Sequence, residues 1–489
     1  MTTSSWPVCR MLGENGGSEQ VKILRSQFGL LLVALLLGLG MTYYYYGLLL
    51  PMRHKDLRLT NAAAGNWSDL YPCWFGAREV LLHRRNPYSL EITRAIQSGY
   101  YGRPVDPSNR RDPRDQAGLA YPLYVIFLLV PFLGLPFATV RVLFTVGLLL
   151  ISAASLLLWL RATRLRLAPS SVLLALTAVM TSYPVLDGLH LQQLTLLVAA
   201  LMAASIASLA GKRFFLGGVL LACATIKPHL VFVLLMGLAL WSFSRWRERK
   251  NLMAGFALTQ AMLLGASELA LPGWFGQWHQ ATLRYVGYVR PSMLGAILGM
   301  KMGLVAAGVA VCLVLLLFWR FRQQEPGSQH FTFLLVCALL VPTLLVPNAG
   351  ASKYNLVLLI PGVLWLFSSG LALRPRSVLV RFGWLLGLNG LLWQWLLALG
   401  VVFAVVVLRH PLQHEATALA AAPEIAVYLF PFTLIPVLLT AIFHLDQIAD
   451  RTGQAQDRPL RLASHSQPAA LHPRLPVRDQ QAPSPTEQP

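Results

Sequence analysis

The chain has 489 residues, of which 56% are hydrophobic and only 12% are charged, and its formal net charge is +20. The apolar residues form unbroken runs long enough to cross a bilayer, which is typical of a polytopic membrane protein and excludes an ordinary soluble enzyme. The positive residues lie mainly in short segments between these runs, where they set orientation and meet anionic lipid headgroups, so nucleic acid is not an expected partner.

The first apolar run begins near Phe28 and ends near Leu50, after a short segment, residues 1–27, that we expect in the cytoplasm. The run is longer than the apolar core of a signal peptide and lacks a small-residue cleavage site, so we interpret it as a retained membrane anchor. The four tyrosines 43–46 at its end are typical of an aromatic belt at the outer membrane surface.

Residues 51–120 form a large first extracytoplasmic loop. It carries charges of both signs and turn-forming stretches such as Asn86-Pro87-Tyr88, so we expect it to contain helices lying on the membrane surface. Within the loop, Asp69 is a lone acidic residue among aromatics, on a helix predicted to begin near Ser68. A simpler interpretation is a first-turn aspartate favoured by the helix dipole.

Basic clusters divide the rest of the membrane domain, which we expect to end near residue 445. They are Arg161–Arg166, Lys212-Arg213, Arg245–Lys250, Arg320 with Arg322, and Arg374 with Arg376 and Arg381. Positive-inside bias places all five clusters in the cytoplasm, and the apolar stretches between them then predict an all-α fold of about 12 transmembrane helices. The short apolar stretch 121–135 contains two prolines and is predicted to be a re-entrant or interfacial helix.

Two further segments complete the predicted layout. Residues 272–291 place tryptophans and tyrosines at helical spacing, as in a helix at the headgroup level, and residues 446–489 are predicted to be a disordered cytoplasmic tail. Both termini are then cytoplasmic, in a bacterial inner (plasma) membrane. The five cysteines show no metal-binding or disulfide spacing, and no His, Asp and Glu constellation predicts a metal or other cofactor.

Several polar residues fall at the predicted outer ends of spans. They are Asp69, Asp187, His190, Gln192, Gln193, Lys227, His229, Glu268 and Lys353-Tyr354-Asn355. Ionisable residues near hydrocarbon cost about 2.5–3.5 kcal/mol each, so we expect these side chains to converge on one polar site. Lys227 is the clearest case, because Pro228 breaks an apolar stretch there and leaves backbone groups and an ammonium suited to a lipid phosphate. Two other interpretations of Lys227 remain open: its side chain snorkels outward to water, or it pairs with Asp187 or Glu268.

The order of these features resembles glycosyltransferase family 87, a family of C-type membrane glycosyltransferases that includes polyprenyl-phosphate-mannose-dependent mannosyltransferases. The resemblance runs from about residue 28 to 370 and rests on Asp69 and Tyr71, Asn86-Pro87-Tyr88, Tyr121-Pro122, Gln193, and Ile226-Lys227-Pro228. The chain departs from the family pattern at two places. Tyr121-Pro122-Leu123 stands where the family tends to have Tyr-Pro-Pro, and Gln192–Thr195 stands where it tends to have Gly-Gln-x-Asn. The resemblance implies a large first outer loop, a lipid-phosphate sugar donor, and a catalytic aspartate at Asp69.

The chemistry of such a donor requires one carboxylate rather than two. A glycoside hydrolase must protonate its leaving alcohol, whereas a lipid phosphate leaves as an anion. One base for the acceptor hydroxyl and cations for the phosphate then suffice, and a single displacement inverts the anomeric carbon. We therefore expect Asp69 to be the base. The predicted substrate-binding residues are Lys227, His229 and Lys353 for the phosphate, His190 and Gln193 for sugar hydroxyls, and Tyr354; Glu268 and Asp187 remain alternative bases.

Two other function classes compete with this interpretation. A transporter or lipid flippase would favour inverted repeats with paired broken helices, and the sequence shows one Lys-Pro break without a clear counterpart. A polysaccharide polymerase or ligase usually carries its large outer loop late in the chain. The sequence therefore predicts a hexosyltransferase, most simply a mannosyltransferase, that moves a sugar from a polyprenyl-phosphate donor to an extracytoplasmic lipid or glycan acceptor.

Overall fold

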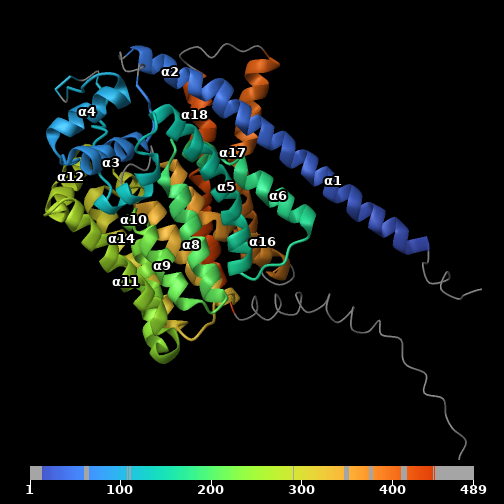
Figure 1. Ribbon diagram of the computed structural model, residues 1–489. Coiled ribbons are helices and arrows are strands. Elements are labelled where there is room, and N and C mark those ends of the chain that lie inside the picture. The colour runs from blue at the N-terminus through green and yellow to red at the C-terminus, as the bar shows by residue number, and fades with distance from the viewer. Residues whose placement is uncertain are drawn as a thin grey trace, which may run out of the picture.

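The computed structural model is a bundle of helices, and the residues it describes contain no strand. The described residues are 14–59, 65–106, 108–109, 112–289, 291–345, 352–373, 378–408, 416–443 and 445. Helices α3, α4 and α12 lie together at one end of the bundle (Figure 1). The predicted disordered tail, residues 446–489, lies outside the described residues.

Six helical segments are long and apolar enough to cross a membrane. They are Phe28–Lys55, Phe137–Ala162, Trp246–Ala270, Met300–Arg320, Arg381–Val406 and Ala420–Ile442. A seventh span results if the pair Pro169–Met180 and Tyr183–His190, bent by 54°, crosses as one broken helix. Six further apolar helices are 10–17 residues long, and at about 1.5 Å per residue none alone spans a hydrocarbon core of about 30 Å. The membrane character is supported, and the twelve crossings stay a prediction.

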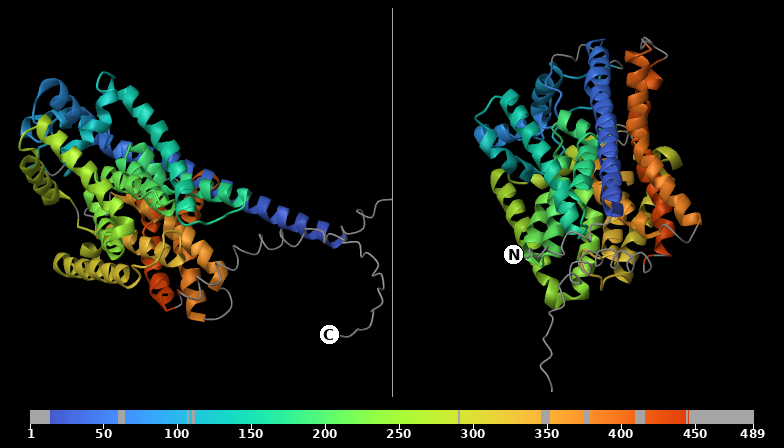
Figure 2. Two further views of the ribbon diagram at one scale, coloured as in Figure 1. Left: turned by 60° about the horizontal axis from the view of Figure 1, so that its bottom comes forward. Right: turned by 90° about the vertical axis from the view of Figure 1, so that its right-hand side faces the viewer.

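The N-terminal helix continues almost without interruption from α1 (Glu14–Tyr43) through a π-helical segment η2 (Tyr44–Leu49) into α2 (Leu50–Leu59). Figures 1 and 2 show that the N-terminal end of α1 extends beyond the rest of the bundle. Its later turns pack against other helices, with Gly38 close to the Thr181 side chain and Gly40 close to Leu399.

The predicted aromatic belt at residues 43–46 is wrong for two of its four members. Tyr44 and Tyr45 are fully buried. The Tyr44 hydroxyl donates to the Ala420 carbonyl, and the Tyr45 hydroxyl donates to Asp187 Oδ1 at 2.8 Å. The two rings face inward because the wider π-helical turn changes the register of the helix at this point.

The first loop folds into two helices, α3 (Tyr71–His83) and α4 (Leu90–Tyr101). Helix α4 begins at a side-chain cap, in which Ser89 Oγ accepts the Ile92 N–H at 3.2 Å. Helix α3 begins two residues after Asp69, so the predicted helix start near residue 68 is wrong: Asp69 lies in the turn that precedes α3.

The predicted short helix at 121–135 forms the 3₁₀ helix η3 (Leu123–Phe132), which contains Pro131. The Tyr124 hydroxyl anchors it by donating to the Thr225 carbonyl at 2.7 Å. This contact joins η3 to the break between α9 and α10, beside Lys227.

The central part of the bundle consists of α5 (Phe137–Ala162), α6 (Pro169–Met180), α7 (Tyr183–His190), α8 (Leu194–Ala210), α9 (Phe214–Ala224), α10 (Pro228–Ser244), α11 (Trp246–Ala270) and α12 (Trp274–Tyr288). Helices α9 and α10 form an antiparallel hairpin, since the first residue of α9, Phe214, stacks near Trp241 at the far end of α10, 6.2 Å between ring centroids. The hairpin turns at Lys227, directly before Pro228 opens α10.

The C-terminal part consists of α13 (Met293–Leu298), α14 (Met300–Arg320), α15 (Gln329–Leu345), η4 (Lys353–Leu359), α16 (Ile360–Leu373), α17 (Val378–Val406), α18 (Ala416–Ala426) and α19 (Leu429–Ile442). Helix α12 covers the first loop: Trp278 Nε1 donates to the Ala120 carbonyl at 3.0 Å, and Arg284 donates to the Tyr88 carbonyl at 2.8 Å. Exposed Phe275 gives its outer side an apolar surface, as expected for an interfacial helix.

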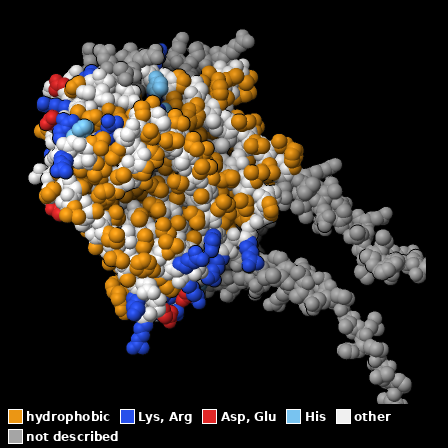
Figure 3. Space-filling view, viewed as in Figure 1, with side chains coloured by type: hydrophobic (Ala, Val, Ile, Leu, Met, Phe, Trp, Pro, Cys, Tyr) orange, Lys and Arg blue, Asp and Glu red, His pale blue; other side chains and the backbone are white. Residues whose placement is uncertain are grey.

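Basic clusters meet at the opposite end of the bundle. Arg164 donates to the Ala210 carbonyl at 3.4 Å, while Arg245 and Arg249 both bond to Glu325, at 2.7 and 3.1 Å. Figure 3 shows a broad apolar belt across the molecule with Lys and Arg side chains along its lower edge. Of the predicted clusters, Arg374 and Arg376 lie outside the described residues.

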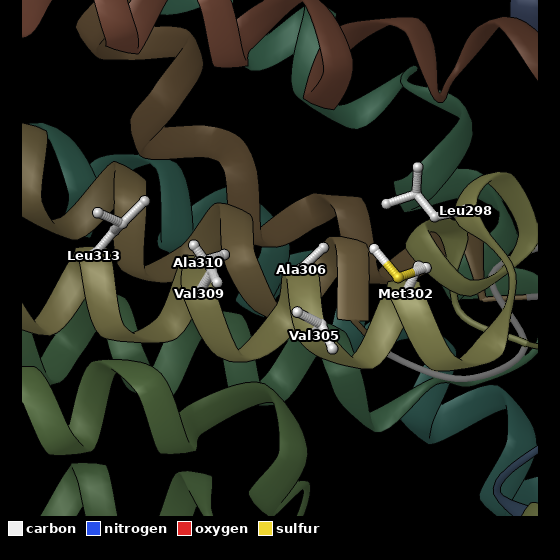
Figure 4. Close-up of a pocket in the computed structure, with 7 residues that line it drawn as sticks. All are labelled: Leu298, Met302, Val305, Ala306, Val309, Ala310 and Leu313. Carbon is white, nitrogen blue, oxygen red and sulfur yellow. The ribbon is translucent and has the colours of Figure 1, made fainter.

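An apolar groove of about 460 Å³ runs along α14 (Figure 4). Its lining residues are Leu298, Met302, Val305, Ala306, Val309, Ala310 and Leu313. None of these side chains can accept or donate a proton, so the chemistry must lie elsewhere.

Candidate active site

The main chain around Asp69 is fixed by bonds to two other segments. The Asp69 N–H donates to the Leu191 carbonyl, at the turn between α7 and α8, at 2.9 Å. Three residues earlier, Asn66 Nδ2 donates to the Gly99 carbonyl of α4 at 2.8 Å. Asp69 is therefore held between the first loop and the bundle.

Two non-glycine residues beside the site have left-handed backbone. Trp67, two residues before Asp69, has φ +46°, and Gln192, directly before Gln193, has φ +51°. Such conformations cost on the order of 1–3 kcal/mol each and are concentrated at functional sites, where the surrounding fold imposes them.

The Asp69 carboxylate accepts two side-chain hydrogen bonds and remains partly exposed. Tyr100 Oη donates to Oδ1 at 3.2 Å, and Gln193 Nε2 donates to Oδ2. Burial raises the pKa of Asp69 above its usual value, and so does the nearby charge of Asp115; the charge of Lys227 and the two donated hydrogen bonds only partly offset this. The carboxylate is therefore a stronger base than an exposed aspartate.

The ammonium of Lys227 lies on the other side of Gln193. It donates to Gln193 Oε1 at 2.5 Å and to Thr195 Oγ1 at 2.7 Å, and Thr195 in turn donates to Asn355 Oδ1 at 2.9 Å. Only 6% of Lys227 is exposed. Each of these acceptors is a neutral oxygen, so the positive charge is solvated but not neutralised by direct contact.

Two phenol rings complete the surroundings of Lys227. Its Nζ lies 5.5 Å from the ring centroid of Tyr121 and 5.1 Å from that of Tyr354. Aromatic faces attract a cation without supplying a counter-ion. Among the described residues, no acidic side chain forms an ion pair with Lys227, which leaves the ammonium able to bind an anion.

A single continuous chain of hydrogen bonds therefore runs from Tyr100 through Asp69, Gln193 and Lys227 to Thr195. The carboxylate of Asp69 and the ammonium of Lys227 are separated by the Gln193 amide, which bonds to both. We call this set, together with Tyr121, Tyr354 and Asn355, the Asp69–Lys227 group.

Comparison with known proteins agrees with this geometry. Residues 119–347 match the model of glycosyltransferase family 87. This match supports membership of glycosyltransferase family 87 for the part of the chain that it covers. The family indicates glycosyltransferase activity, with a sugar donor and an acceptor. The matched region contains Tyr121, Gln193 and Lys227 but not Asp69. No curated protein and no solved structure matches the chain.

Two other predicted binding residues of this glycosyltransferase lie near the group. His229 is exposed on the first turn of α10, close enough to Lys227 for that charge to act on its imidazole. His190, at the end of α7, is partly exposed, with its ring centroid 6.1 Å from that of Tyr45. Its neighbour Leu191 bonds to Asp69.

Lys353, which the sequence assigns to the phosphate, has an acidic partner of its own. It forms an ion pair with Glu424 of α18, to which Arg53 also bonds at 2.8 Å. The next residue, Tyr354, turns instead toward Lys227. The structure thus separates two neighbouring residues that the sequence grouped.

The two alternative bases occupy other surroundings. Glu268 is exposed and accepts the Gly273 N–H at 2.7 Å, a local contact at the turn between α11 and α12. Asp187 accepts the Tyr45 hydroxyl and lies 3.6 Å from Arg53. Neither carboxylate bonds to a member of the Asp69–Lys227 group.

Sequence reasoning assigned no site role to three members of the group, Tyr100, Thr195 and Tyr121. Thr195 follows Gln193 by two residues, and Tyr121 belongs to the Tyr121-Pro122 pair, so position alone could have suggested both. Tyr100 carries no such signal, because the first loop holds several tyrosines and only its fold brings this one to Asp69.

Proposed function

We propose that the protein is an integral-membrane hexosyltransferase that moves a sugar from a polyprenyl-phosphate donor to a hydroxyl group of an extracytoplasmic lipid or glycan acceptor, with inversion. The observation that supports this best is the bridge from Asp69 through Gln193 to Lys227. The bridge brings a partly exposed carboxylate next to an ammonium that, among the described residues, has no acidic contact, and this supports roles as base and phosphate-binding cation.

Lys227 is proposed to bind the donor phosphate. In the structure the ammonium contacts neutral oxygens, and a phosphate oxygen in their place would make a stronger, charge-assisted hydrogen bond. Lys227 also precedes the first turn of α10, where the helix dipole favours an anion, and His229 is exposed on that same turn. The positive charge would stabilise the phosphate as it departs.

Asp69 is proposed to take the proton of the acceptor hydroxyl. The acceptor oxygen forms a bond to the anomeric carbon as the bond from that carbon to the phosphate oxygen breaks, and the phosphate leaves with the electron pair. Tyr100 and Gln193 each hold one carboxylate oxygen, which orients the base. One displacement of this kind inverts the anomeric centre.

Two finer points rest on other grounds. The resemblance of the motifs to polyprenyl-phosphate-mannose-dependent enzymes supports mannose as the sugar. The basic clusters around Arg164, Arg245 and Arg249 lie at the end of the bundle away from the Asp69–Lys227 group. Under the positive-inside rule this supports an extracytoplasmic active site.

The test is transfer of radiolabelled mannose from a polyprenyl-phosphate donor by the purified protein in lipid nanodiscs. We expect Asp69→Asn to lose on the order of 10²-fold or more in rate, while undecaprenyl phosphate binds as it does to the wild type. Lys227→Gln should weaken that binding. Asp106→Asn, which changes an exposed carboxylate of the same loop, is the control.

Near wild-type transfer by Asp69→Asn would remove Asp69 as the base. A wild-type protein that binds undecaprenyl phosphate but transfers no sugar from any polyprenyl-phosphate donor would overturn the proposed function as a whole.

A further inference from the structure

A second carboxylate, that of Asp115, lies close to Asp69 and has no role in the mechanism proposed above. Asp115 comes after α4, on the segment that leads to η3, and its side chain is exposed. Its charge acts on Asp69 and also on Tyr100, whose hydroxyl donates to Asp69 Oδ1 at 3.2 Å. The proposed base therefore has an acidic neighbour that a ligand can reach.

Helix α4 holds Asp115 and the proposed base in fixed relative positions. Tyr101 Oη donates to the Asp115 carbonyl at 2.8 Å, and the centroid of the Tyr101 ring lies 4.7 Å from that of Tyr100. Gln97, earlier on α4 and only 2% exposed, donates to the carbonyl of Gln116 at 3.1 Å. The same helix thus anchors the segment of Asp115 and supplies the hydroxyl that bonds to the base.

The carboxylate of Asp115 keeps most of its capacity to accept hydrogen bonds. Oδ1 accepts the Ala117 N–H at 2.9 Å, and within the described residues no other donor and no cation contacts the carboxylate. Asp112 of the same loop, in contrast, forms an ion pair with Arg103 at 2.7 Å. An ionised carboxylate has about four acceptor positions, so Asp115 can accept hydrogen bonds from a bound ligand.

Water reaches Asp115, and yet protein surrounds it. Burial raises the pKa of its carboxyl group above the usual value, although the side chain is exposed. Helix α12 supplies part of these surroundings, since the charge of Asp115 also acts on the phenol of Tyr288, and α12 lies beside α3 and α4 (Figure 1). Such an environment is typical of a carboxylate that lines a binding site, not of one on an open surface.

Asp115 and Lys227 are connected to different oxygens of Asp69. Oδ2 accepts from Gln193, which in turn accepts from Lys227. Oδ1 accepts from Tyr100 of α4, the helix that holds Asp115. In an in-line displacement the acceptor and the leaving phosphate occupy opposite faces of the sugar. A negative charge on the α4 side disfavours a phosphate there, and it favours a neutral hydroxyl that donates a hydrogen bond.

We propose that Asp115 is a specificity-determining residue, which accepts a hydrogen bond from a second hydroxyl of the acceptor, beside the hydroxyl that Asp69 deprotonates. This inference rests on the proposed function, because it takes Asp69 as the base. An acceptor held at two points presents one particular hydroxyl to Asp69, so Asp115 selects the position that receives the sugar. The acceptor is then a polyol with neighbouring hydroxyls and not an alcohol with a single one.

The experiment measures transfer of radiolabelled mannose from a polyprenyl-phosphate donor by the purified full chain in lipid nanodiscs. The acceptors are octyl glycosides, their monodeoxy analogues, each of which lacks one hydroxyl, and octanol. The variant is Asp115→Asn, whose amide oxygen can still accept the Ala117 N–H. Asp106→Asn is the matched control, since Asp106 is exposed on the same loop and accepts the Ser108 N–H at 2.9 Å in the same way. All rates are measured at a pH above the acid limb of every variant, where Asp69 is ionised.

We expect Asp115→Asn to raise the acceptor KM by about tenfold, the difference between a hydrogen bond to a charged acceptor and one to a neutral acceptor. Its binding of undecaprenyl phosphate should equal that of the wild type, and Asp106→Asn should change neither quantity. One monodeoxy analogue should be a poorer acceptor for the wild type but no poorer than its parent for Asp115→Asn, because the two changes remove the same hydrogen bond. The wild type should form one linkage and Asp115→Asn a mixture.

Three outcomes would overturn the inference. An acceptor KM of Asp115→Asn within twofold of the wild type removes the contact. Additive losses for every monodeoxy analogue mean that Asp115 acts through its electric field and not through a hydroxyl. Transfer to octanol as fast as to any glycoside means that no second hydroxyl is bound. A wild type that transfers sugar to none of the acceptors would instead count against the proposed function, which keeps the two failures distinguishable.

Discussion

Replacing Gln193 by leucine removes the side chain that, within the described residues, bonds to both charged members of the proposed active site. The amide donates to Asp69 and accepts from Lys227, and only 2% of the residue is exposed. Each lost hydrogen bond to a charged partner costs about 1.5–3 kcal/mol. Since Lys227 keeps Thr195 and Asp69 keeps Tyr100, we expect a net loss of about 2–4 kcal/mol rather than the full sum.

The loss of activity should exceed what the loss of stability implies. Without the amide between them, the ammonium of Lys227 and the carboxylate of Asp69 can form a direct ion pair. Neither group is then available to bind substrate. We expect initial transfer rates, corrected for the folded fraction, to fall by about 10- to 100-fold, since about 1.4 kcal/mol of the barrier corresponds to a factor of ten.

The matched control is Gln394→Leu. Gln394 is also buried, at 5% exposure, but its partners are the backbone groups of Tyr183 and Leu391. This variant should lower the thermal midpoint without changing the rate per folded molecule. Gln193→Leu at a rate within twofold of the wild type would refute the bridging role, whatever its stability.

The remaining predictions concern pH and the first loop. Burial and the charge of Asp115 both raise the pKa of Asp69, and the proposed base must be ionised to accept a proton. Asp115→Asn should therefore lower this pKa and move the acid limb of the pH–rate profile to lower pH. A limb that does not move, or that moves to higher pH, would contradict the assignment of Asp69 as the base. Gly99→Ala should lower the thermal midpoint, because its Cβ would lie 1.8 Å from the Tyr71 hydroxyl and the buried Tyr71 ring would have to move. Gly134→Ala, with nothing within 4 Å, should melt like the wild type. Equal melting of both variants would show that α4 does not pack against Tyr71.

The sequence predicts best what depends on local signals. Pro228 marks the helix break at Lys227 because a proline lacks the N–H that a helix interior needs, and the structure turns at that residue. Gln193 is assigned from its place at a turn between two apolar runs, and the structure places it between Asp69 and Lys227.

Long-range pairings were not predictable in the same way. The sequence assigns Lys353 to a phosphate, but its partner Glu424 comes 71 residues later, too far along the chain for a local pattern to link the two. Hydropathy also adds up apolar residues without showing where a helix bends. It therefore does not reveal that the apolar stretch from Pro169 to His190 is bent between Met180 and Tyr183. Tyr100 reaches Asp69 only because α4 folds back over the segment before α3.

The N-terminal helix is held at Tyr44 and Tyr45, where its π-helical segment Tyr44–Leu49 begins, and again at Arg53 beyond that segment, so its length between these contacts is fixed. Each α-helical residue adds about 100° of rotation, so deleting one residue here would swing everything beyond it by roughly a quarter turn. Arg53 on α2 would then turn away from Asp187 and Glu424 and lose its ion pairs with them. The number of residues between the tyrosine hydroxyl bonds and Arg53 thus aligns the N-terminal helix with α7 and α18.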